Sequence, residues 1–390
     1  MTPQRTSTPA TPPAPDRPRV AIAHDYLTQR GGAERVVLAM HRAFPEAPIY
    51  TTLYEPAATF PELADADVRV SPLNRIRFLR HHHRAALPVL APASSAFTVD
   101  ADLTLVSSTG WAHGFRATGR KLVYCHSPAR FLYLRGQYLG GSSTLSTKGA
   151  ALTLLGPGLL RWDQRAAATA DRYLANSTIV AERIARVYGI EADVLFPPGG
   201  VRSGHDLQAV PSLEAWLTPG YHLVVSRLMP YKNVDVAVEA CRGMPDRCLV
   251  VIGRGPEEAR LRQVAPDNVQ LLHGLTDAQM RWCYAHAQAL IAPSFEDFGL
   301  TPLEAYSCGT PVLALRGGGY LDTVDEGLSG LFFDEPTAPA VREVVTRGET
   351  HPWDGEAIRR HGEGFSEERF AARLHAEVEA LLVPEGGGSR

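Results

Sequence analysis

The sequence predicts an α/β protein of two doubly wound, parallel-sheet domains that face each other across a cleft. Short apolar runs of strand length alternate with helical patterns along most of the chain, as in parallel sheets covered by helices. A Pro-Pro-Gly-Gly break at 197–200 interrupts the series, which then begins again. The length of 390 residues also suits two domains better than one core.

The first series opens with an apolar run at 19–24, followed by a loop that contains two glycines. Val36, Met40 and Phe44 then recur at every fourth position, which predicts an amphipathic helix. The order strand, loop, helix, strand is typical of the start of a doubly wound domain. The remaining strands of this domain are expected at 48–51, 103–106, 121–124, 173–175 and 194–196.

The second series has the same alternation, and it ends in a helix marked by Phe370, Leu374, Val378 and Leu382. Its strands are expected at 222–226, 249–252, 269–272, 290–292 and 312–315, with helices at 234–240 and 277–286 between them. The predicted division is a disordered Thr- and Pro-rich tail at 1–17, domains at 18–198 and 199–365, and a final helix at 366–384.

Composition points to an ordinary globular protein. Hydrophobic residues make up 45% and charged residues 21%, and the net charge is −3, so no basic excess indicates nucleic-acid binding. No apolar run reaches 18 residues, and the tail lacks the apolar segment of a secretion signal. The 5 cysteines include no CxxC pair, which favours buried, reduced thiols. We therefore expect a cytoplasmic protein.

The most informative motif is EDFGLTPLE at 296–304. Thr301 is expected to cap a helix, so Phe298, Gly299 and Leu300 would lead into its anion-binding N-terminus. Glu296 precedes the helix and Glu304 lies in its first turns. Two carboxylates so spaced can reach different parts of one long polar ligand. The alternative is that both are solvated surface charges, although their apolar surroundings favour partners.

A second motif, SRLMPYKN at 226–233, directly follows the first strand of the second domain. Arg227 offers a planar fork and Lys232 a point charge, and the two together suit a diphosphate. Such cations would stabilise the charge that grows on a departing diphosphate. Two solvated loop cations are the alternative interpretation.

Two glycine motifs carry weaker signals. Gly253 and Gly255 permit close backbone approach to a ligand, although a plain tight turn explains them about as well. Gly31 and Gly32 enter a helix and could hold an anion or a sugar by backbone N–H groups. The Gly31 and Gly32 motif does not match GxGxxG or a P-loop, which argues against a nicotinamide enzyme or a P-loop kinase.

One histidine stands out at the end of a first-domain strand. His126 lies in YCHSPAR and could contact a transferred group across the cleft. A single histidine is more often structural, and that alternative stays open.

A basic stretch at 75–84 contains Arg75, Arg77, Arg80 and Arg84, and it is followed by a largely apolar run. It could lie on an anionic membrane surface and collect a lipid-linked acceptor, or it could be a solvated helix face. Three adjacent histidines at 81–83 point in different directions, so we expect no metal site there.

Taken together, these motifs resemble glycosyltransferase family 4, and within it the bacterial mannosyltransferase-like members of surface-polysaccharide pathways. The resemblance runs from residue 19 to the final helix. It is carried by HDYLTQRGGAERV at 24–36, YCHSPARFLY at 124–133, ANSTIVAERI at 175–184, SRLMPYKNVDVAVEA at 226–240, VVIGRGPE at 250–257 and EDFGLTPLEAYSCGTPV at 296–312.

The family resemblance implies the GT-B fold, with two Rossmann-like domains and a final helix that crosses back to the first. It also implies a retaining reaction, usually without a metal, so no cofactor is expected. Arg227 and Lys232 would hold the donor diphosphate, Glu304 the ribose and Glu296 the hexose, with His126 near the reacting centre. The implied donor-binding set also contains Gly31, Gly32, Ser226, Gly253, Arg254, Gly255, Phe298, Gly299, Leu300 and Thr301.

We therefore expect a retaining transfer of a hexose, mannose from GDP-mannose, onto a glycan or lipid-linked acceptor. A UDP-hexose donor stays open, because Asn233 and Arg254 depart from the family pattern. A GT-B epimerase or hydrolase and a non-catalytic sugar-nucleotide-binding protein also stay open. A front-face route fits the lack of an obvious nucleophile, and double displacement is the second possible route.

Overall fold

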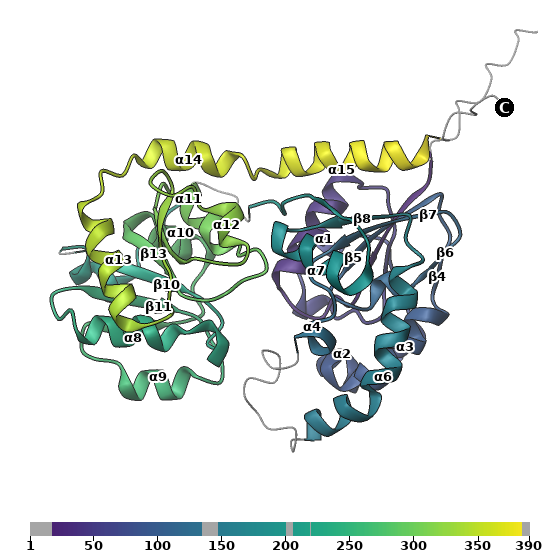
Figure 1. Cartoon of the computed structure of the whole chain (residues 1–390), viewed down its shortest axis with the longest axis horizontal. Helices are drawn as coiled ribbons and strands as arrows, with labels where there is room; N and C mark the ends of the chain where they lie inside the picture. Colours follow the sequence, from purple (N-terminus) through teal and green to yellow (C-terminus); the bar gives the residue numbers. More distant parts are fainter. Residues whose placement is uncertain (1–17, 135–146, 200–205, 219, 384–390) are drawn as a thin grey trace, which may run out of the picture.

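The computed structural model describes residues 18–134, 147–199, 206–218 and 220–383. The helices and strands form two α/β lobes that lie side by side, and the last two helices run along one side of both lobes (Figure 1). Each lobe contains one parallel sheet, which is the arrangement that the alternating apolar runs predict.

The first sheet has 7 strands in the order β3-β2-β1-β5-β7-β8-β9, all parallel. Their bounds are β1 (Val20–His24), β2 (Ile49–Thr51), β3 (Val68–Val70), β5 (Leu103–Ser108), β7 (Arg120–Cys125), β8 (Arg172–Ala175) and β9 (Asp193–Val194), while β4 (Thr98–Val99) pairs with β6 (Arg116–Ala117). The helices of this lobe are α1 (Gly32–Ala43), α2 (Arg77–His81), α3 (Leu87–Ala96), α4 (Arg130–Tyr133), α6 (Thr147–Ala167) and α7 (Thr178–Tyr188).

The second sheet has 6 parallel strands in the order β12-β11-β10-β13-β14-β15. These are β10 (Tyr221–Val225), β11 (Cys248–Ile252), β12 (Val269–Leu272), β13 (Ala287–Ala292), β14 (Val312–Leu315) and β15 (Gly330–Phe333). The helices are α8 (Val234–Arg242), α9 (Glu258–Val264), α10 (Asp277–His286), α11 (Thr301–Ser307), α12 (Tyr320–Thr323), α13 (Ala338–Thr350), α14 (Gly355–Glu363) and α15 (Glu367–Leu382). Short 3-10 helices are η1 (Pro56–Ala58), η2 (Pro61–Leu63), η3 (Pro72–Arg75), η4 (His83–Ala86), η5 (Ala112–Gly114), η6 (Pro211–Trp216) and η7 (Pro230–Lys232).

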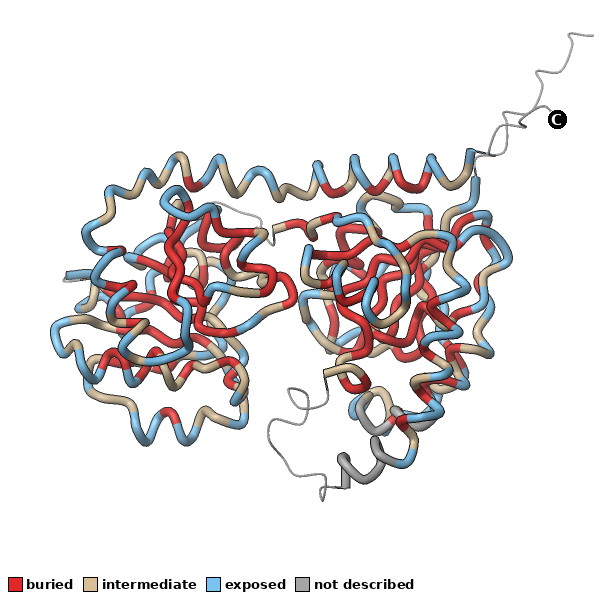
Figure 2. Tube along the Cα trace, in the orientation of Figure 1, coloured by how far each residue is buried: buried red, intermediate tan, exposed pale blue. Residues whose placement is uncertain are grey.

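The final helix α15 returns to the first lobe, as the sequence predicts. Ser366 caps its N-terminus, and the buried side chains of Phe370, Leu374 and Val378 join the core of the first sheet. Phe370 meets Tyr124 of β7 edge-on, with ring centroids 5.7 Å apart. Each such buried side chain contributes roughly 1.5–3 kcal/mol. Figure 2 shows buried residues along both sheets and on one side of α15.

Most predicted strands and helices form within a few residues of their expected bounds, and the exceptions have physical reasons. The run expected as a strand at 194–196 is wrong beyond Val194, because Phe196 packs against Phe298 and Phe365 with centroids 5.8 and 5.5 Å away. The edge strand β3 has no apolar run to reveal it, since two of its three residues are exposed.

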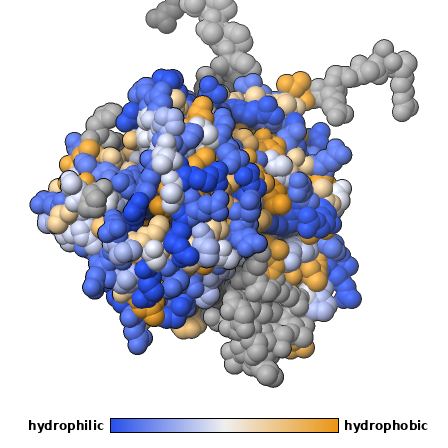
Figure 3. Space-filling view, turned by 60° about the vertical axis from the view of Figure 1, so that its left-hand side comes forward, coloured by the Kyte–Doolittle hydropathy of each residue, from blue (hydrophilic) through white to orange (hydrophobic). Residues whose placement is uncertain are grey.

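No helix among the described residues is long and apolar enough to cross a membrane. On the face drawn in Figure 3, hydrophilic residues predominate and hydrophobic ones form small, scattered patches. All 5 cysteines are free, as predicted, and burial raises the pKa values of the Cys241 and Cys283 thiols to about 12.

Candidate active site

The first domain contributes the ends of β1, β5 and β7 and the start of α1. Strand β1 ends at His24, and α1 begins at Gly32 after a short loop. The N-cap residue of α1, Gly31, leaves the first backbone N–H groups of the helix without a side-chain cap. A Cβ at Gly31 would lie only 2.5 Å from Glu34 Oε2, so a larger residue there would have to displace the buried carboxylate beside it.

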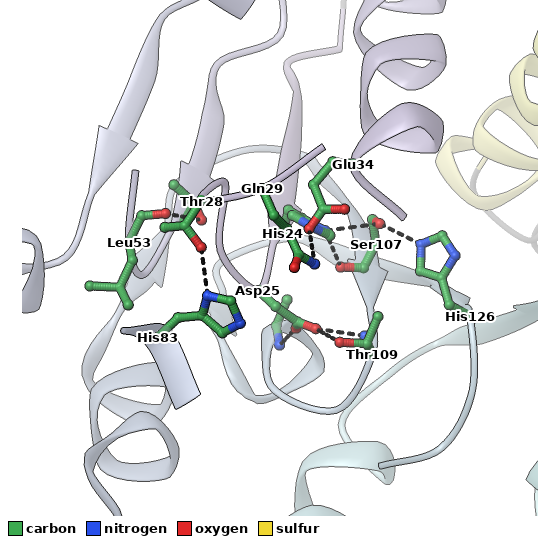
Figure 4. Close-up of polar contacts among 12 residues, drawn as sticks. His24, Asp25, Thr28, Gln29, Glu34, Leu53, His83, Ser107, Thr109 and His126 are labelled. Atoms are coloured by element: carbon green, nitrogen blue, oxygen red, sulfur yellow. Dashed lines mark hydrogen bonds and ion pairs between the residues drawn. The ribbon is translucent and has the colours of Figure 1, made fainter. Parts of the chain in front are cut away.

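Four side chains form a continuous polar chain in this domain (Figure 4). His24 Nδ1 lies 3.0 Å from both the Ser107 carbonyl oxygen and Ser107 Oγ, and Ser107 Oγ lies 2.8 Å from His126 Nε2. On the other side, His24 Nε2 lies 3.9 Å from Glu34 Oε1, which also accepts a 2.9 Å hydrogen bond from Gln29. All members of the chain lie at the carboxyl ends of parallel strands or beside them, where open α/β sheets bind ligands.

The charges of the two histidines differ because their neighbours differ. Burial disfavours the charged forms of His24 and Glu34, but their mutual attraction outweighs it, raising the pKa of His24 and lowering that of Glu34. Burial, together with the nearby positive His24, lowers the pKa of His126 to about 4. His126 is therefore neutral at neutral pH and can both donate and accept a hydrogen bond.

The second domain contributes a cluster of charged groups on the loops after β10 and β13. Lys232 at the end of η7 forms an ion pair with Glu296, which also accepts a 2.5 Å hydrogen bond from Ser294. Arg227 is exposed and lies 3.2 Å from the hydroxyl of Tyr231. The sequence predicted that Lys232 and Glu296 act on one ligand, and the structure brings them into direct contact.

Glu304 lies in the first turn of α11 and is buried. Its Oε2 accepts a 2.7 Å hydrogen bond from Tyr284, and its Oε1 lies 3.7 Å from Arg35 Nη1 of α1 in the first domain. The predicted capping role of Thr301 is wrong: Leu300 occupies the N-cap position, and its side chain makes no capping bond.

The two glycines after β11 are required by the protein's own backbone. A Cβ at Gly253 would lie 1.8 Å from the Ser226 carbonyl oxygen, and one at Gly255 would lie 2.2 Å from that of Leu228. These contacts explain both glycines without a ligand. The neighbouring Arg254 is exposed and hydrogen-bonds to His273 at 3.0 Å.

Asn233 has a φ of 52°, and it is the non-glycine residue with positive φ in the described part of the chain. Glycine adopts this left-handed conformation most easily, and asparagine is one of the few other residues that adopt it, so Asn233 can keep this backbone although it departs from the family pattern. The side chain compensates by donating a 3.0 Å hydrogen bond to the Pro293 carbonyl oxygen. Asn233 therefore ties the Lys232 loop to the segment that leads to Glu296.

The two domains touch at this site. A Cβ at Gly32 would lie 3.1 Å from Leu300 Cδ1, so the start of α1 lies against the predicted motif of the second domain. Gly299 has a φ of 86°, which shapes the turn before Leu300.

One buried contact between the domains was not predicted from the sequence. Asp297 of the second domain is buried between two first-domain arginines, at 2.5 Å from Arg130 and 2.8 Å from Arg183. Burial alone would raise the pKa of Asp297, but the two guanidinium groups outweigh it and lower that pKa. The sequence offered one signal, because Asp297 adjoins Glu296 and Arg130 lies in the His126 motif.

The basic stretch at 75–84 folds into η3, α2 and η4, and its His83 lies beside the loop that follows β1 (Figure 4). The three histidines have separate partners: His81 lies 3.9 Å from Glu55, His82 stacks on Phe78, and His83 bonds to Thr28 at 3.0 Å. Among the described residues, no group of three or more His, Cys, Asp or Glu side chains is placed to hold a metal ion.

Comparison with known proteins identifies both domains. Residues 30–205 match the family model "Glycosyltransferase Family 4", and residues 212–360 match "Glycosyl transferases group 1". A D-inositol 3-phosphate glycosyltransferase of Acidothermus cellulolyticus is 34% identical over 197 residues, which are 43% of each chain. A GDP-mannose-dependent alpha-(1-6)-phosphatidylinositol dimannoside mannosyltransferase of Mycobacterium tuberculosis is 33% identical over 43% of this chain and 46% of its own. The chain thus spans about half the length of the curated relatives that it matches.

Solved structures show the same fold at low sequence identity. The sucrose-phosphate synthase of Thermosynechococcus elongatus has a TM-score of 0.68 and 18% identity, covering 93% of this chain and 99% of its own. HepE of Anabaena, solved with UDP, has a TM-score of 0.65 and 15% identity, covering 93% and 100%. The predicted GT-B fold is confirmed by these neighbours and by the two parallel sheets. The chain belongs to the glycosyltransferases that join a family 4 domain to a group 1 domain.

Proposed function

We propose that this chain is a retaining hexosyltransferase that moves mannose from GDP-mannose to an acceptor hydroxyl. The observation that carries the proposal is the meeting of Gly32 and Arg35 of α1 with Leu300 and Glu304 of the second domain. A donor bound along the second domain would meet groups of the first domain there. Family membership supports the same reaction class.

In the proposed reaction, the donor diphosphate takes Lys232 from Glu296 and also binds Arg227. Positive charge placed at a leaving group lowers the barrier to its departure. Once released from Lys232, Glu296 accepts hydrogen bonds from hydroxyls of the hexose, while Glu304 binds the ribose. The sugar C1–O bond breaks toward an oxocarbenium-like state, the acceptor oxygen forms its bond on the same face, and the departing phosphate takes the acceptor proton.

The donor-binding residues proposed around these groups are Ser226, Gly253, Arg254, Gly255, Phe298, Gly299 and Thr301. Arg254 is exposed next to His273 and is the group we assign to the base. The guanine assignment is supported by the mycobacterial relative, which is named as GDP-mannose-dependent. A UDP-hexose is the second candidate, since HepE was solved with UDP. We propose that no metal takes part.

For the acceptor we propose a glycan or lipid-linked molecule, collected at a membrane surface through the 75–84 stretch. Ile76 and Phe78 are 48% and 60% exposed beside Arg75 and Arg77. Exposed apolar side chains among cations favour adsorption to anionic lipids. Sedimentation with phosphatidylglycerol vesicles tests this: we expect co-sedimentation that Phe78→Ser reduces, and equal binding to neutral vesicles would contradict it.

The donor is tested by a thermal-shift titration with GDP, UDP, GDP-mannose, UDP-glucose and UDP-N-acetylglucosamine, with EDTA present. A ligand that binds only the folded state raises the melting temperature. We expect a rise with GDP and GDP-mannose alone. A rise with uridine ligands would change the donor, and no rise with any ligand would contradict the site. Donor turnover without acceptor would instead indicate an epimerase or hydrolase, and binding without any product a non-catalytic protein.

A further inference from the structure

His126 belongs to the proposed reaction, and side chains of the first domain determine which tautomer its imidazole ring adopts. A neutral histidine has two tautomers, which place the N–H donor and the bare nitrogen at opposite sides of the ring. Only a partner of known hydrogen-bond polarity selects one of them. For His126, that partner is Ser107 Oγ, 2.8 Å from Nε2.

The direction of donation along this hydrogen-bond chain is fixed at His24. Its Nδ1 lies 3.0 Å from the Ser107 carbonyl oxygen, and a carbonyl oxygen can only accept, so Nδ1 carries a proton. The same N–H lies 3.0 Å from Ser107 Oγ, which therefore accepts from it as well. On its far side, His24 faces the Glu34 carboxylate, which favours a proton on Nε2 too.

The hydroxyl proton of Ser107 then has one acceptor. Because His24 donates to Oγ, the hydroxyl hydrogen points to His126 Nε2, which must be unprotonated. If Nε2 carried the proton instead, Ser107 Oγ would accept twice and its own buried hydrogen would have no acceptor among the described residues. Leaving a buried donor unpaired is unfavourable, so the first arrangement is preferred.

We propose that His24 and Ser107 are positioning residues that hold His126 in the tautomer with its ring proton on Nδ1. Nδ1 has no hydrogen-bond partner in the described part of the chain, so its N–H is available to a ligand. Resting on the proposed function, the ligand group is a hydroxyl of the transferred hexose. His24 and Ser107 touch no substrate themselves.

Two further features support a fixed chain. Asp25, next to His24, accepts hydrogen bonds from the backbone N–H groups of Thr109 at 2.7 Å and Trp111 at 3.1 Å, which ties the end of β1 to the loop after Ser107 and Ser108. The charged groups that face His126 are His24, Asp25, Glu34 and Asp297; burial and the positive His24 lower its pKa to about 4, although the three carboxylates act in the opposite direction. The ring is thus neutral, so the choice of tautomer matters.

The test is long-range ¹H–¹⁵N correlation on protein labelled with ¹⁵N-histidine, with His126 assigned by the loss of its signals in His126→Gln. In the ligand-free wild type at pH 7, we expect a protonated Nδ1 and a bare Nε2. Ser107→Ala should give a mixture of tautomers, and Ser107→Thr should restore one. Thr104→Val is the matched control, because it removes another buried hydroxyl of β5 that bonds to no partner in the described residues.

A proton on Nε2 of wild-type His126, or an unchanged tautomer in Ser107→Ala, would overturn the inference. In donor turnover we expect Ser107→Ala to lower kcat/KM about tenfold, which corresponds to the loss of one hydrogen bond. The melting temperature of Ser107→Ala should equal that of Thr104→Val. The two proposals fail separately. If His126 has the expected tautomer but the protein has no transferase activity, only the proposed function is rejected. If the protein is active but His126 carries its proton on Nε2, only the positioning role of His24 and Ser107 is rejected.

Discussion

The two halves of the site are built in opposite ways. In the first domain, His24, Glu34, Ser107 and His126 are buried, and each polar contact points to the next member. In the second domain, Lys232 is also buried, but it pairs with Glu296, which has Ser294 as its other partner, and Arg227 is exposed.

This difference indicates that the two domains have different roles in the site. A buried hydrogen-bond network cannot change partners cheaply, so it suits a fixed hydrogen-bond donor. An ion pair between two side chains can exchange one partner for a ligand of like charge. The first domain is therefore the rigid half of the site in our account, and the second domain is the half whose contacts rearrange.

The largest effect is expected where the two halves are joined. Asp297→Ala leaves Arg130 and Arg183 facing each other with no carboxylate between them, and breaking a buried ion pair in this way costs about 3–5 kcal/mol. We expect urea denaturation to show a loss of that size.

Asp322→Ala is the matched control for this prediction. Asp322 also joins the domains, through hydrogen bonds of 2.8 and 2.6 Å from Thr178, but it does so at the exposed surface. Exposed contacts contribute about 1 kcal/mol or less. We call the contact of Asp297 with Arg130 and Arg183 the buried clasp. Equal losses in the two variants would show that the buried clasp stabilises the protein no more than an exposed contact does.

The next effect separates binding from turnover in the second domain. Lys232→Met should weaken GDP binding roughly 10- to 100-fold, because a charge-assisted hydrogen bond contributes about 1.5–3 kcal/mol. Glu296→Gln should leave GDP affinity equal or higher, since it frees Lys232, while donor turnover falls about 100-fold or more. Calorimetric titration and a donor-turnover assay measure the two quantities.

Glu326→Gln serves as the control for the second-domain variants, because Glu326 pairs with Arg316 on the surface. It should change neither quantity. Turnover at the wild-type rate in Glu296→Gln would remove Glu296 from the site.

The next prediction concerns the pH dependence of stability, to which one buried histidine in each domain contributes. Burial lowers the pKa values of His126 and His222 to about 4, so folding favours their neutral forms. A depressed histidine pKa means that the unfolded chain binds the proton first, and stability is lost as the pH falls from about 6.5 to about 4. The loss is about 3 kcal/mol for each group.

Unfolding free energies at pH 7, 5.5 and 4 check this prediction. His126→Gln and His222→Gln should each reduce the loss of unfolding free energy between pH 7 and pH 4 by about the contribution of that histidine. The double variant should reduce it by the sum of the two contributions. An acid side that neither variant changes would show that other groups control it.

The smallest effect is expected at the surface cluster of Arg316, Glu326 and Asp334, whose contacts of 3.0 and 2.8 Å resemble those of the clasp in length. Its three members are substantially exposed. Arg316→Ala should change the unfolding free energy by no more than about 1 kcal/mol, and by less in high salt. A loss as large as that of Asp297→Ala would contradict the weight we give to burial.

Much of the fold could be predicted from the sequence, because parallel strands buried on both faces appear as apolar runs. The bounds of β12 and β14 were found in this way, and those of α10 were found from its helical pattern. Motif spacing also indicated Glu296, Lys232 and His126. The edge strand β3 escaped because exposed strands carry no such run.

The contacts between distant segments could not be predicted. Asp297 bonds to Arg130 and Arg183, which lie more than a hundred residues away in the chain, and nothing in the sequence sets their pairing. The true reason for Gly253 was also hidden, since the Ser226 backbone that it avoids lies on a neighbouring strand end. Local pattern predicts elements, whereas pairing across the fold needs coordinates.

The most direct test of the account is a double-mutant cycle on donor turnover with His126→Gln and Glu296→Gln. If His126 of the first domain and Glu296 of the second act on one sugar, each single change should lower kcat/KM. Groups that act as a unit are not additive, and the double variant should therefore lose less than the product of the two single losses. Losses that multiply fully, or a single variant with wild-type kcat/KM, would show that the two domains do not share one reacting centre.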